Sequence, residues 1–260
     1  MKAVRLHKFH TQPVIDDVPE PTISGPLDVI VKIGGAGVCR TDLHIIEGQW
    51  DAAMGTPLPY ILGHENAGWV HEIGSGVTNV QPGDTVILHP LVTDGVCHAC
   101  RAGDDMHCEH NAFPGLSRDG GMAEYLLTSE RACIKLNPET QPKDVAALAD
   151  AGITAYHAVR KAIPLLYPGT SAVVIGAGGL GHIGVQCLEA LTSTATVPLC
   201  ATTLTLPCRT LSSVPSYTFT VVEPRAPSTI AALVPPGRPV GYGARPPGRR
   251  VDTGPCPTLR

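Results

Sequence analysis

Hydrophobic residues in the first 134 positions occur in short runs that glycine and proline interrupt. Four runs rich in β-branched or aromatic residues stand out: DVIVKIGGAGV, AGWVHEIGSGV, GDTVILHP and AEYLLTS. Short strands at this spacing, with turn residues between them, are typical of a barrel-like all-β domain and not of a βαβ repeat. We therefore predict that residues 1–150 form a β-barrel domain.

Helical spacing of apolar residues begins only after this region. The stretch PKDVAALADAGITAYHAVRKA, with Pro142 and Asp144 near its start, predicts one or two short helices. The stretch SAVVIGAGGLGHIGVQCLEAL, residues 171–191, then reads as a buried strand, a glycine-rich turn and an amphipathic helix. This order is typical of the start of a parallel α/β domain, so the predicted fold class is α/β plus β, with residues 151–191 opening the second domain.

The composition changes abruptly near Leu191. Residues 1–191 contain 12 Lys plus Arg and 21 Asp plus Glu, which gives a formal charge of −9. The 69 residues that follow contain 12 of the 25 prolines, seven Arg and two acidic residues, for a charge of +5, and they lack Lys, His, Asn, Gln, Met and Trp. Prolines break this segment every few residues. We expect residues 192–260 to be a Pro/Thr/Arg-rich tail of poor order.

Composition and charge also narrow the function classes. The start, MKAVRLHKF, has no long apolar stretch or cleavage site, and no run approaches the ~20 apolar residues of a membrane span. Three of the nine cysteines cluster beside acids and histidines, as metal ligands do, which favours reduced thiols. The tail arginines stand among prolines without lysine or interleaved aromatic residues. We expect a soluble cytoplasmic protein with no nucleic-acid and no membrane partner.

Two motifs predict a catalytic metal site. GVCRTDLH contains Cys39 and Asp42, and GHENAGWVHEIGSGV, residues 63–77, contains His64 and Glu65 within a regular glycine framework. In order and spacing they resemble the zinc motifs of medium-chain, zinc-dependent alcohol dehydrogenases. Such a zinc ion keeps three protein ligands and one open position. Taken singly, Cys39 also suits a small buried residue and His64 a hydrogen-bonded core histidine, but the joint pattern favours zinc.

The resemblance implies a third ligand and the roles of the neighbouring residues. The family supplies Cys or Asp just before a G-x-T turn, where LADAGITAYHAV has Asp150, whose alternative role is that of a helix cap. A thiolate, an imidazole and a carboxylate leave a Zn²⁺ site neutral. By the same resemblance, Glu65 is a transient or outer ligand and Asp42 orients His64. At further matched positions, the resemblance implies that Thr41 accepts the alcohol's proton and passes it through the nicotinamide ribose to His44 at the surface. It also implies that Arg40 meets the pyrophosphate and that Thr154 contacts the nicotinamide end.

A second metal site is predicted in DGVCHACRAGDDMHC, residues 94–108. The spacing of Cys97, Cys100 and Cys108 resembles the structural zinc lobe of the same family, but Asp94 stands where the family has its first cysteine. An aspartate oxygen can complete a tetrahedral zinc site, though with a weaker preference than a thiolate, and His98 or His107 can replace it if the loop bends. We predict a Cys₃Asp site in preference to a three-thiolate lobe with altered or absent metal. Such a lobe contributes to folding and not to hydride transfer.

The sequence VVIGAGGLGHIG predicts a loop that binds a nucleotide. Gly176, Gly178 and Gly181 follow an apolar strand in G-x-G-x-x-G order. With the intervening Gly179, they precede a helix whose N-terminus offers N–H groups to a pyrophosphate. In the family, an acidic residue about 20 positions further on binds the adenosine ribose and indicates NAD. Here TATVPLCATTL stands in that place, and the first carboxylate is Glu223.

The resemblance implies a GroES-like β-barrel catalytic domain followed by a Rossmann, doubly wound, nucleotide-binding domain that is truncated near Leu191. We interpret the break as a shifted reading frame or a fused, unrelated end. A strand and helix without neighbours leave their apolar faces uncovered, and the surface through which the family forms homo-oligomers is then missing. Trp50 and Tyr60 suit either substrate-pocket walls or core packing.

Two functions remain open at this stage. The first is a zinc- and NAD-dependent alcohol dehydrogenase, resembling bacterial secondary-alcohol members, that converts a small alcohol to an aldehyde or ketone and is impaired in this chain. Within that class, a polyol or threonine dehydrogenase is the alternative, and a zinc-free quinone reductase is disfavoured because it does not need three metal ligands. The second is a non-catalytic zinc-binding fragment of such an enzyme.

Overall fold

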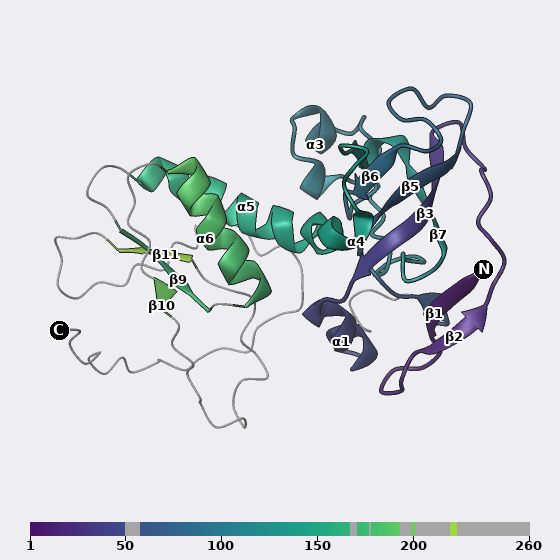
Figure 1. Ribbon diagram of the computed structural model, residues 1–260, viewed down its shortest axis with the longest axis horizontal. Coiled ribbons are helices and arrows are strands. Elements are labelled where there is room, and N and C mark those ends of the chain that lie inside the picture. The colour runs from purple at the N-terminus through teal and green to yellow at the C-terminus, as the bar shows by residue number, and fades with distance from the viewer. Residues whose placement is uncertain (50–57, 167–170, 177, 193–198, 201–218, 223–260) are drawn as a thin grey trace.

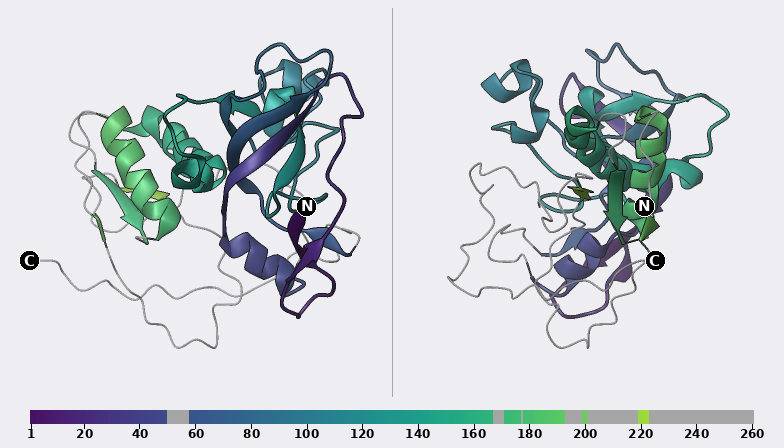
Figure 2. Two further views of the ribbon diagram at one scale, coloured as in Figure 1. Left: turned by 45° about the vertical axis from the view of Figure 1, so that its right-hand side comes forward. Right: turned by 90° about the vertical axis from the view of Figure 1, so that its left-hand side faces the viewer.

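The computed structural model describes residues 1–49, 58–166, 171–176, 178–192, 199–200 and 219–222. Its elements form two regions (Figure 1), a β-rich region that includes the N-terminus and a smaller region of helices α5 and α6 with strands β9 to β11. Helix α5 extends from the β-rich region toward α6, and the left-hand view of Figure 2 shows the same division. The order of an all-β region followed by helices and a strand confirms the predicted fold class.

Two antiparallel sheets build the β-rich region. The larger has the strand order β7-β3-β5-β6-β8 and the smaller the order β2-β1-β4. The strands are β1 (Lys2–Leu6), β2 (Val14–Asp17), β3 (Asp28–Gly37), β4 (Tyr60–Ile61), β5 (Glu65–Ile73), β6 (Thr85–Leu88), β7 (Tyr125–Ser129) and β8 (Cys133–Lys135). β3 and β5 pair along nearly their whole length, with register shifts at Ile30/Val31 and Ile33/Gly35. This pairing places the end of β3 beside the start of β5, and the candidate metal ligands lie there.

Each sheet has its own apolar core. The larger sheet buries a valine-rich cluster that includes Val29, Val31 and Val86, each with no exposed surface. The smaller sheet packs Leu6, Tyr60 and Leu62 against helix α1 (Arg40–Ile46). A fully buried side chain of this size contributes about 1.5–3 kcal/mol to stability. Tyr60 is 4% exposed within this core, which favours the core-packing alternative, whereas Trp50 lies outside the described residues.

Three short helices lie within the β-rich region, between β6 and β8: α3 (His98–Arg101), η1 (Asp105–His107) and η2 (Glu130–Ala132). The helices that follow β8 lead to the second region: α4 (Pro142–Val145), η3 (Ala146–Ala149), α5 (Ala151–Ala162) and η4 (Ile163–Leu165). The predicted helical stretch over 142–162 is thus confirmed as α4, η3 and α5. None of the helices in the described part of the chain has the length and hydrophobicity that crossing a bilayer requires.

The second region contains the predicted strand and helix, β9 (Ser171–Ile175) and α6 (Gly179–Leu191). Their apolar core includes Val159, Ala172 and Leu188. The expectation that β9 has no neighbouring strands is wrong, because β10 (Leu199–Cys200) pairs with it in parallel and β11 (Phe219–Val222) pairs antiparallel on its other side. β11 belongs to the apolar run YTFTVV, whose β-branched residues suit a strand. The remainder of the segment for which poor order was expected, with Glu223, lies outside the described residues.

Candidate active site

Cys39 occupies the turn between strand β3 and helix α1. It is the N-cap of α1 in an extended conformation, and its backbone N–H donates a 2.8 Å hydrogen bond to Asp42 Oδ2. This bond satisfies one of the N–H groups that a helix start leaves without a partner. Asp42 is only 2% exposed, so its carboxylate is fixed between the helix start and the protein interior.

His64 lies immediately before strand β5 and is 2% exposed. Its Nδ1 atom is 3.5 Å from Asp42 Oδ1, and its Nε2 atom is 3.6 Å from Asp150 Oδ2. Neither ring nitrogen has a hydrogen-bond partner among the described residues, and Asp42 Oδ1 also lacks one. Buried polar atoms without partners are rare and call for a specific explanation, such as an ion.

Asp150 is the residue from which helix α5 begins. It stands at the N-cap position, but its side chain makes no capping hydrogen bond. The carboxylate instead faces the His64 ring. The alternative that Asp150 serves only as a helix cap is therefore not supported, and its side chain remains available as a ligand.

Glu65 completes the cluster from the first position of β5. It is 3% exposed, and the backbone of Ala151, at the start of α5, acts to lower its pKa. A Cβ atom on Gly37 would collide with Glu65 Oε2, so this carboxylate occupies space that is open only because residue 37 has no side chain. Glu65 thus connects β3, β5 and α5 at one point.

These contacts bring together four residues from three segments that are distant in sequence. One potential ligand atom from each of Cys39, His64, Glu65 and Asp150 lies within 4.8 Å of the others. The sulfur, imidazole and carboxylate donors are types that zinc binds in proteins. Their closeness and the unpartnered ring nitrogens of buried His64 both fit a zinc ion. The structure therefore places the three predicted ligands and Glu65 in one cluster.

The electrostatics of the cluster follow from burial and proximity. The neighbouring His64 imidazole lowers the pKa of the Cys39 thiol, against the effect of burial, and the Thr41 backbone and hydroxyl act in the same direction. Burial lowers the pKa of His64, but Asp42, Cys39 and Asp150 outweigh it and raise that pKa to about 10. Burial raises the pKa of both Glu65 and Asp150. The cluster thus contains a thiol that readily loses its proton beside an imidazole that readily binds one.

Helices α1 and α5 carry the other predicted residues of this site. Thr41 is half-buried and interacts with the Cys39 thiol, and His44 lies one turn further, with Nδ1 3.7 Å from Glu47 Oε2. Arg40 is exposed at the first position of α1. Thr154 is exposed in the first turn of α5, and its N–H donates to the carbonyl of Asp150.

The glycine-rich loop has the shape that its sequence predicts. Gly176 follows strand β9 with φ +95°, a conformation that favours glycine, and Gly178 is the N-cap of α6. A Cβ atom on Gly181 would collide with the Gly176 carbonyl oxygen, so the helix approaches the end of the strand closely at this glycine, whereas a Cβ atom on Gly179 would meet open space. This arrangement fits a nucleotide pyrophosphate at the helix start.

The second cluster lies in the loop around helix α3. One potential ligand atom from each of Asp94, Cys97, Cys100 and Cys108 lies within 4.8 Å of the others. Asp94 Oδ1 accepts the N–H groups of Val96 and Cys97 at 2.8 and 3.0 Å. His98 is exposed, and His107 Nδ1 pairs with Asp104 Oδ2 at 2.8 Å, so neither histidine joins the cluster. The geometry agrees with the predicted Cys₃Asp donor set.

Sequence reasoning missed two residues that contact this lobe. His110 Nδ1 lies 2.9 Å from Asp94 Oδ2. Arg131, between β7 and β8, donates to Asp105 Oδ2 at 2.9 Å and to Thr93 Oγ1 at 3.3 Å, and so connects the lobe to the sheets of the β-rich region. The position of His110, two residues after Cys108 in a stretch rich in His and Asp, was the available signal. No spacing in the sequence indicates Arg131, because its partners are distant along the chain.

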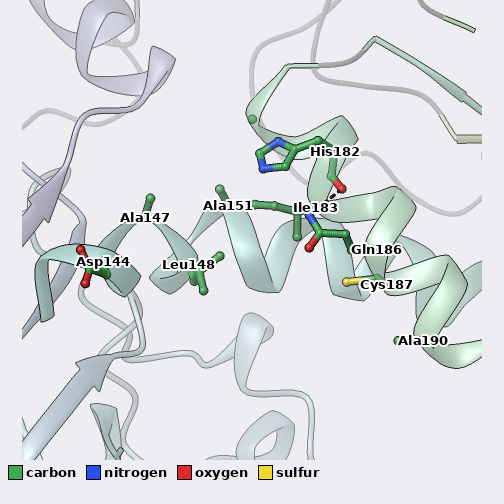
Figure 3. A pocket seen from close by; sticks show the side chains of 10 residues that line it. Asp144, Ala147, Leu148, Ala151, His182, Ile183, Gln186, Cys187 and Ala190 are labelled. Carbon is green, nitrogen blue, oxygen red and sulfur yellow. Dashed lines mark hydrogen bonds between the residues drawn. The ribbon is translucent and has the colours of Figure 1, made fainter. Parts of the chain in front are cut away.

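A groove of about 560 Å³ separates the start of α5 from helix α6 (Figure 3). Its walls are mainly apolar and include Leu148, Ala151, Ile183 and Cys187, with His182 and Gln186 on the α6 side. Of the residues predicted to bind metal or nucleotide, the groove contacts Gly179. The groove is thus a feature of the contact between the two helices, and the metal cluster lies elsewhere.

Comparison with known proteins gives a consistent assignment. Residues 25–138 match the family described as "Alcohol dehydrogenase GroES-like domain". A D-arabinose 1-dehydrogenase (NADP(+)) of Saccharolobus solfataricus is 42% identical over 199 residues, which are 75% of this chain and 56% of that protein. An NAD-dependent alcohol dehydrogenase of Sulfolobus acidocaldarius is 38% identical over 196 residues, 74% of this chain and 56% of that protein.

A solved structure extends the agreement to the fold. The alcohol dehydrogenase of the hyperthermophilic archaeon Aeropyrum pernix superimposes with a TM-score of 0.71 at 51% identity, over 76% of this chain and 58% of that one. The chain therefore spans little more than half the length of the relatives it matches. The matched domain, the clustered donor residues and these similarities support the resemblance of this chain to the zinc-type, medium-chain alcohol dehydrogenases.

Proposed function

We propose that Cys39, His64 and Asp150 hold a catalytic zinc ion in an NAD-dependent alcohol dehydrogenase. The observation that carries this proposal is the convergence of three donor types from distant segments at a buried histidine whose ring nitrogens have no hydrogen-bond partner among the residues that the structure describes. Residues 1–150 form the catalytic domain and residues 151–191 begin the nucleotide-binding domain. One thiolate, one carboxylate and a neutral imidazole balance the charge of Zn²⁺.

The bound groups supply the central chemistry: zinc polarises an alcohol oxygen as a Lewis acid, and NAD accepts a hydride. Asp42 keeps the His64 ring in place through its carboxylate at 3.5 Å. Thr41 holds a hydroxyl beside the cluster and takes the proton that the alcohol loses, and His44, on the same face of α1, carries it toward solvent. Glu65 keeps a carboxylate at the start of α5 as an additional donor.

The nucleotide contacts are assigned to the glycine loop and to two polar side chains. Gly176, Gly178, Gly179 and Gly181 form the pyrophosphate site, Arg40 provides a positive charge, and Thr154 contacts the nicotinamide end. We propose NAD as the cofactor and a small alcohol, with its aldehyde or ketone, as the substrate pair. The D-arabinose dehydrogenase named for NADP(+) makes a sugar or polyol substrate the alternative within this class.

The lobe formed by Asp94, Cys97, Cys100 and Cys108 is assigned a structural zinc ion. Three sulfur donors and one carboxylate lie within 4.8 Å, a distance range that one tetrahedral ion can span. The six cysteines among the described residues are all free thiols, which leaves these three available as ligands.

The experiment combines metal analysis with cofactor reduction. Zinc-loaded protein is mixed with NAD or NADP and primary alcohols, secondary alcohols or D-arabinose, and reduced cofactor is followed by its absorbance. The proposal predicts alcohol-dependent reduction that Cys39→Ala abolishes and that Cys187→Ala, which changes a cysteine outside both clusters, leaves intact. Reduction that persists at full rate in Cys39→Ala contradicts the zinc mechanism.

A non-catalytic zinc-binding fragment is the second candidate. The observation in its favour is that the chain spans only 56% of the curated relatives. Titration with reduced cofactor distinguishes the two candidates. Zinc bound at the buried site without cofactor affinity supports the fragment, whereas saturable cofactor binding with turnover supports the enzyme.

A further inference from the structure

Asp94 differs from the three cysteines of its lobe because its carboxylate has other partners besides a metal. Oδ1 accepts two backbone N–H groups, from Val96 and Cys97. A carboxylate oxygen has two lone pairs, so these bonds occupy the capacity of Oδ1. Oδ2 is therefore the oxygen that remains able to bind a metal.

His110 contacts this remaining oxygen. Its Nδ1 atom lies 2.9 Å from Asp94 Oδ2, and it approaches from the segment that follows Cys108. One hydrogen bond to Oδ2 leaves one lone pair for a metal. The Asp94 side chain is 18% exposed, whereas the His110 side chain is 74% exposed. His110 is thus an outer residue that contacts the protected carboxylate without filling the cluster.

Asp94 also interacts with the thiol side of the lobe. Its backbone N–H points to Cys108 Sγ at 3.5 Å. Contacts therefore restrain both the backbone and the side chain of Asp94. The Cys108 sulfur contacts its backbone N–H, and His110 and two backbone amides contact its carboxylate. Rotation of the carboxylate about its side-chain bonds would have to break several of these contacts together.

We propose that His110 is a positioning residue that holds Asp94 Oδ2 toward the three thiols, so that aspartate serves as the fourth ligand of a zinc ion. This inference rests on the assignment of structural zinc to the lobe. Zinc prefers thiolate to carboxylate, so an aspartate ligand needs restraint that a cysteine does not. Residues that hydrogen-bond to a ligand supply such restraint, and their removal typically lowers metal affinity about 10–100-fold.

The test measures zinc release from the full chain to an excess of a chromogenic chelator. The phase that belongs to the lobe is the one missing in Cys100→Ser. His110→Ala is expected to accelerate this phase about tenfold, and His110→Asn, whose amide can donate from a position close to that of Nδ1, is expected to restore most of the wild-type rate. The matched control is His107→Ala, which removes a histidine paired with Asp104 at 2.8 Å in the same lobe but outside the ligand cluster.

The outcomes separate the two assignments. If wild-type protein and Cys100→Ser contain equal amounts of zinc, the lobe holds no zinc and the underlying assignment fails. If the lobe releases zinc at the same rate in wild type and His110→Ala, only the role of His110 is overturned. Equal acceleration in His107→Ala and His110→Ala also overturns it, because the effect would then reflect the loop as a whole. If His110→Ala fails to fold by circular dichroism, His110→Phe, which lacks the donor, is compared with His110→Asn, and equal rates in these two overturn the inference.

Discussion

The two donor clusters of this chain are built in opposite ways. The cluster of Cys39, His64 and Asp150 draws its residues from three distant segments, and neither ring nitrogen of its buried central histidine has a hydrogen-bond partner in the described part of the chain. The lobe cluster comes from 15 consecutive residues, and its carboxylate already has protein partners on both oxygens. The polar atoms of the first cluster therefore need an ion as a partner, whereas the carboxylate of the lobe is already held by hydrogen bonds within the protein.

The largest expected effect is on stability when metal is removed. Cys100→Ser protein retains only the buried site, and we expect chelation to lower its Tm by about 10 °C, since an ion at about 1,000 times its Kd contributes ~4 kcal/mol. Cys39→Ser protein retains only the lobe, and its Tm should fall by less. Differential scanning calorimetry of both variants, with and without chelator, measures the two shifts. Equal shifts would remove the contrast between the clusters.

The next effect is a dependence of that stabilisation on pH. In the metal-free protein, the surrounding Asp42, Cys39 and Asp150 overcome burial and raise the pKa of His64 to about 10, whereas the unfolded chain releases this proton near ~6.5. The folded state therefore binds the extra proton between these values, and the free energy of unfolding of metal-free protein falls as pH rises through this window.

Zinc requires a deprotonated imidazole and thiolate, so its binding is favoured by the same rise in pH. The Tm difference between zinc-loaded and metal-free Cys100→Ser protein should therefore grow from about pH 6.5 to about pH 9. Thermal melts at intervals across this range provide the measurement. A difference that stays constant or shrinks would show that His64 does not hold the proton in the metal-free fold.

A smaller effect is expected from the residue that orients the buried histidine. Asp42→Asn removes the charge beside His64 Nδ1 but keeps an oxygen that can accept the N–H of Cys39. Zinc affinity at the buried site should fall about 10–100-fold in competition titrations. Asp144→Asn, an exposed carboxylate on α4, is the matched control. Unchanged affinity in Asp42→Asn would mean that the histidine is held by packing alone.

The smallest effect concerns the connection between the lobe and the barrel. The ion pair of Arg131 with Asp105 is partly exposed, at 42% and 40% of the two side chains. Arg131→Ala should therefore lower the free energy of unfolding by no more than about 1 kcal/mol in urea denaturation. Arg101→Ala, an exposed arginine in the same lobe, serves for comparison. A loss above about 2 kcal/mol would indicate that the lobe depends on this connection more than on its own framework.

Most of the donor residues could be predicted from the sequence because they stand in short motifs of recognisable composition and spacing. Cys39, His64 and the glycine loop stand within recognisable patterns, and the alternation of short β runs indicates the barrel. Asp150 needed the family resemblance, since a single acid before a helix is equally typical of a cap. The structure added the decisive point that its side chain makes no capping bond.

Other features could not be predicted because they depend on tertiary placement. The contacts of Glu65 with the Ala151 backbone, of His110 with Asp94 and of Arg131 with Asp105 join segments whose proximity no spacing encodes. Strand β11 was also missed as a partner of β9, because frequent prolines in the surrounding segment outweighed the β-branched run at 219–222. Whether such a short segment forms a strand depends more on pairing with a neighbouring strand than on its own composition.

The central claim is that one ion is held jointly by residues 39, 64 and 150, and cobalt substitution of the Cys100→Ser protein tests it most directly. The account predicts one bound Co²⁺ with a thiolate-to-cobalt charge-transfer band, which Cys39→Ser eliminates, and weaker binding in both His64→Ala and Asp150→Asn. An unchanged band in Cys39→Ser, or full affinity in the other two variants, would contradict it.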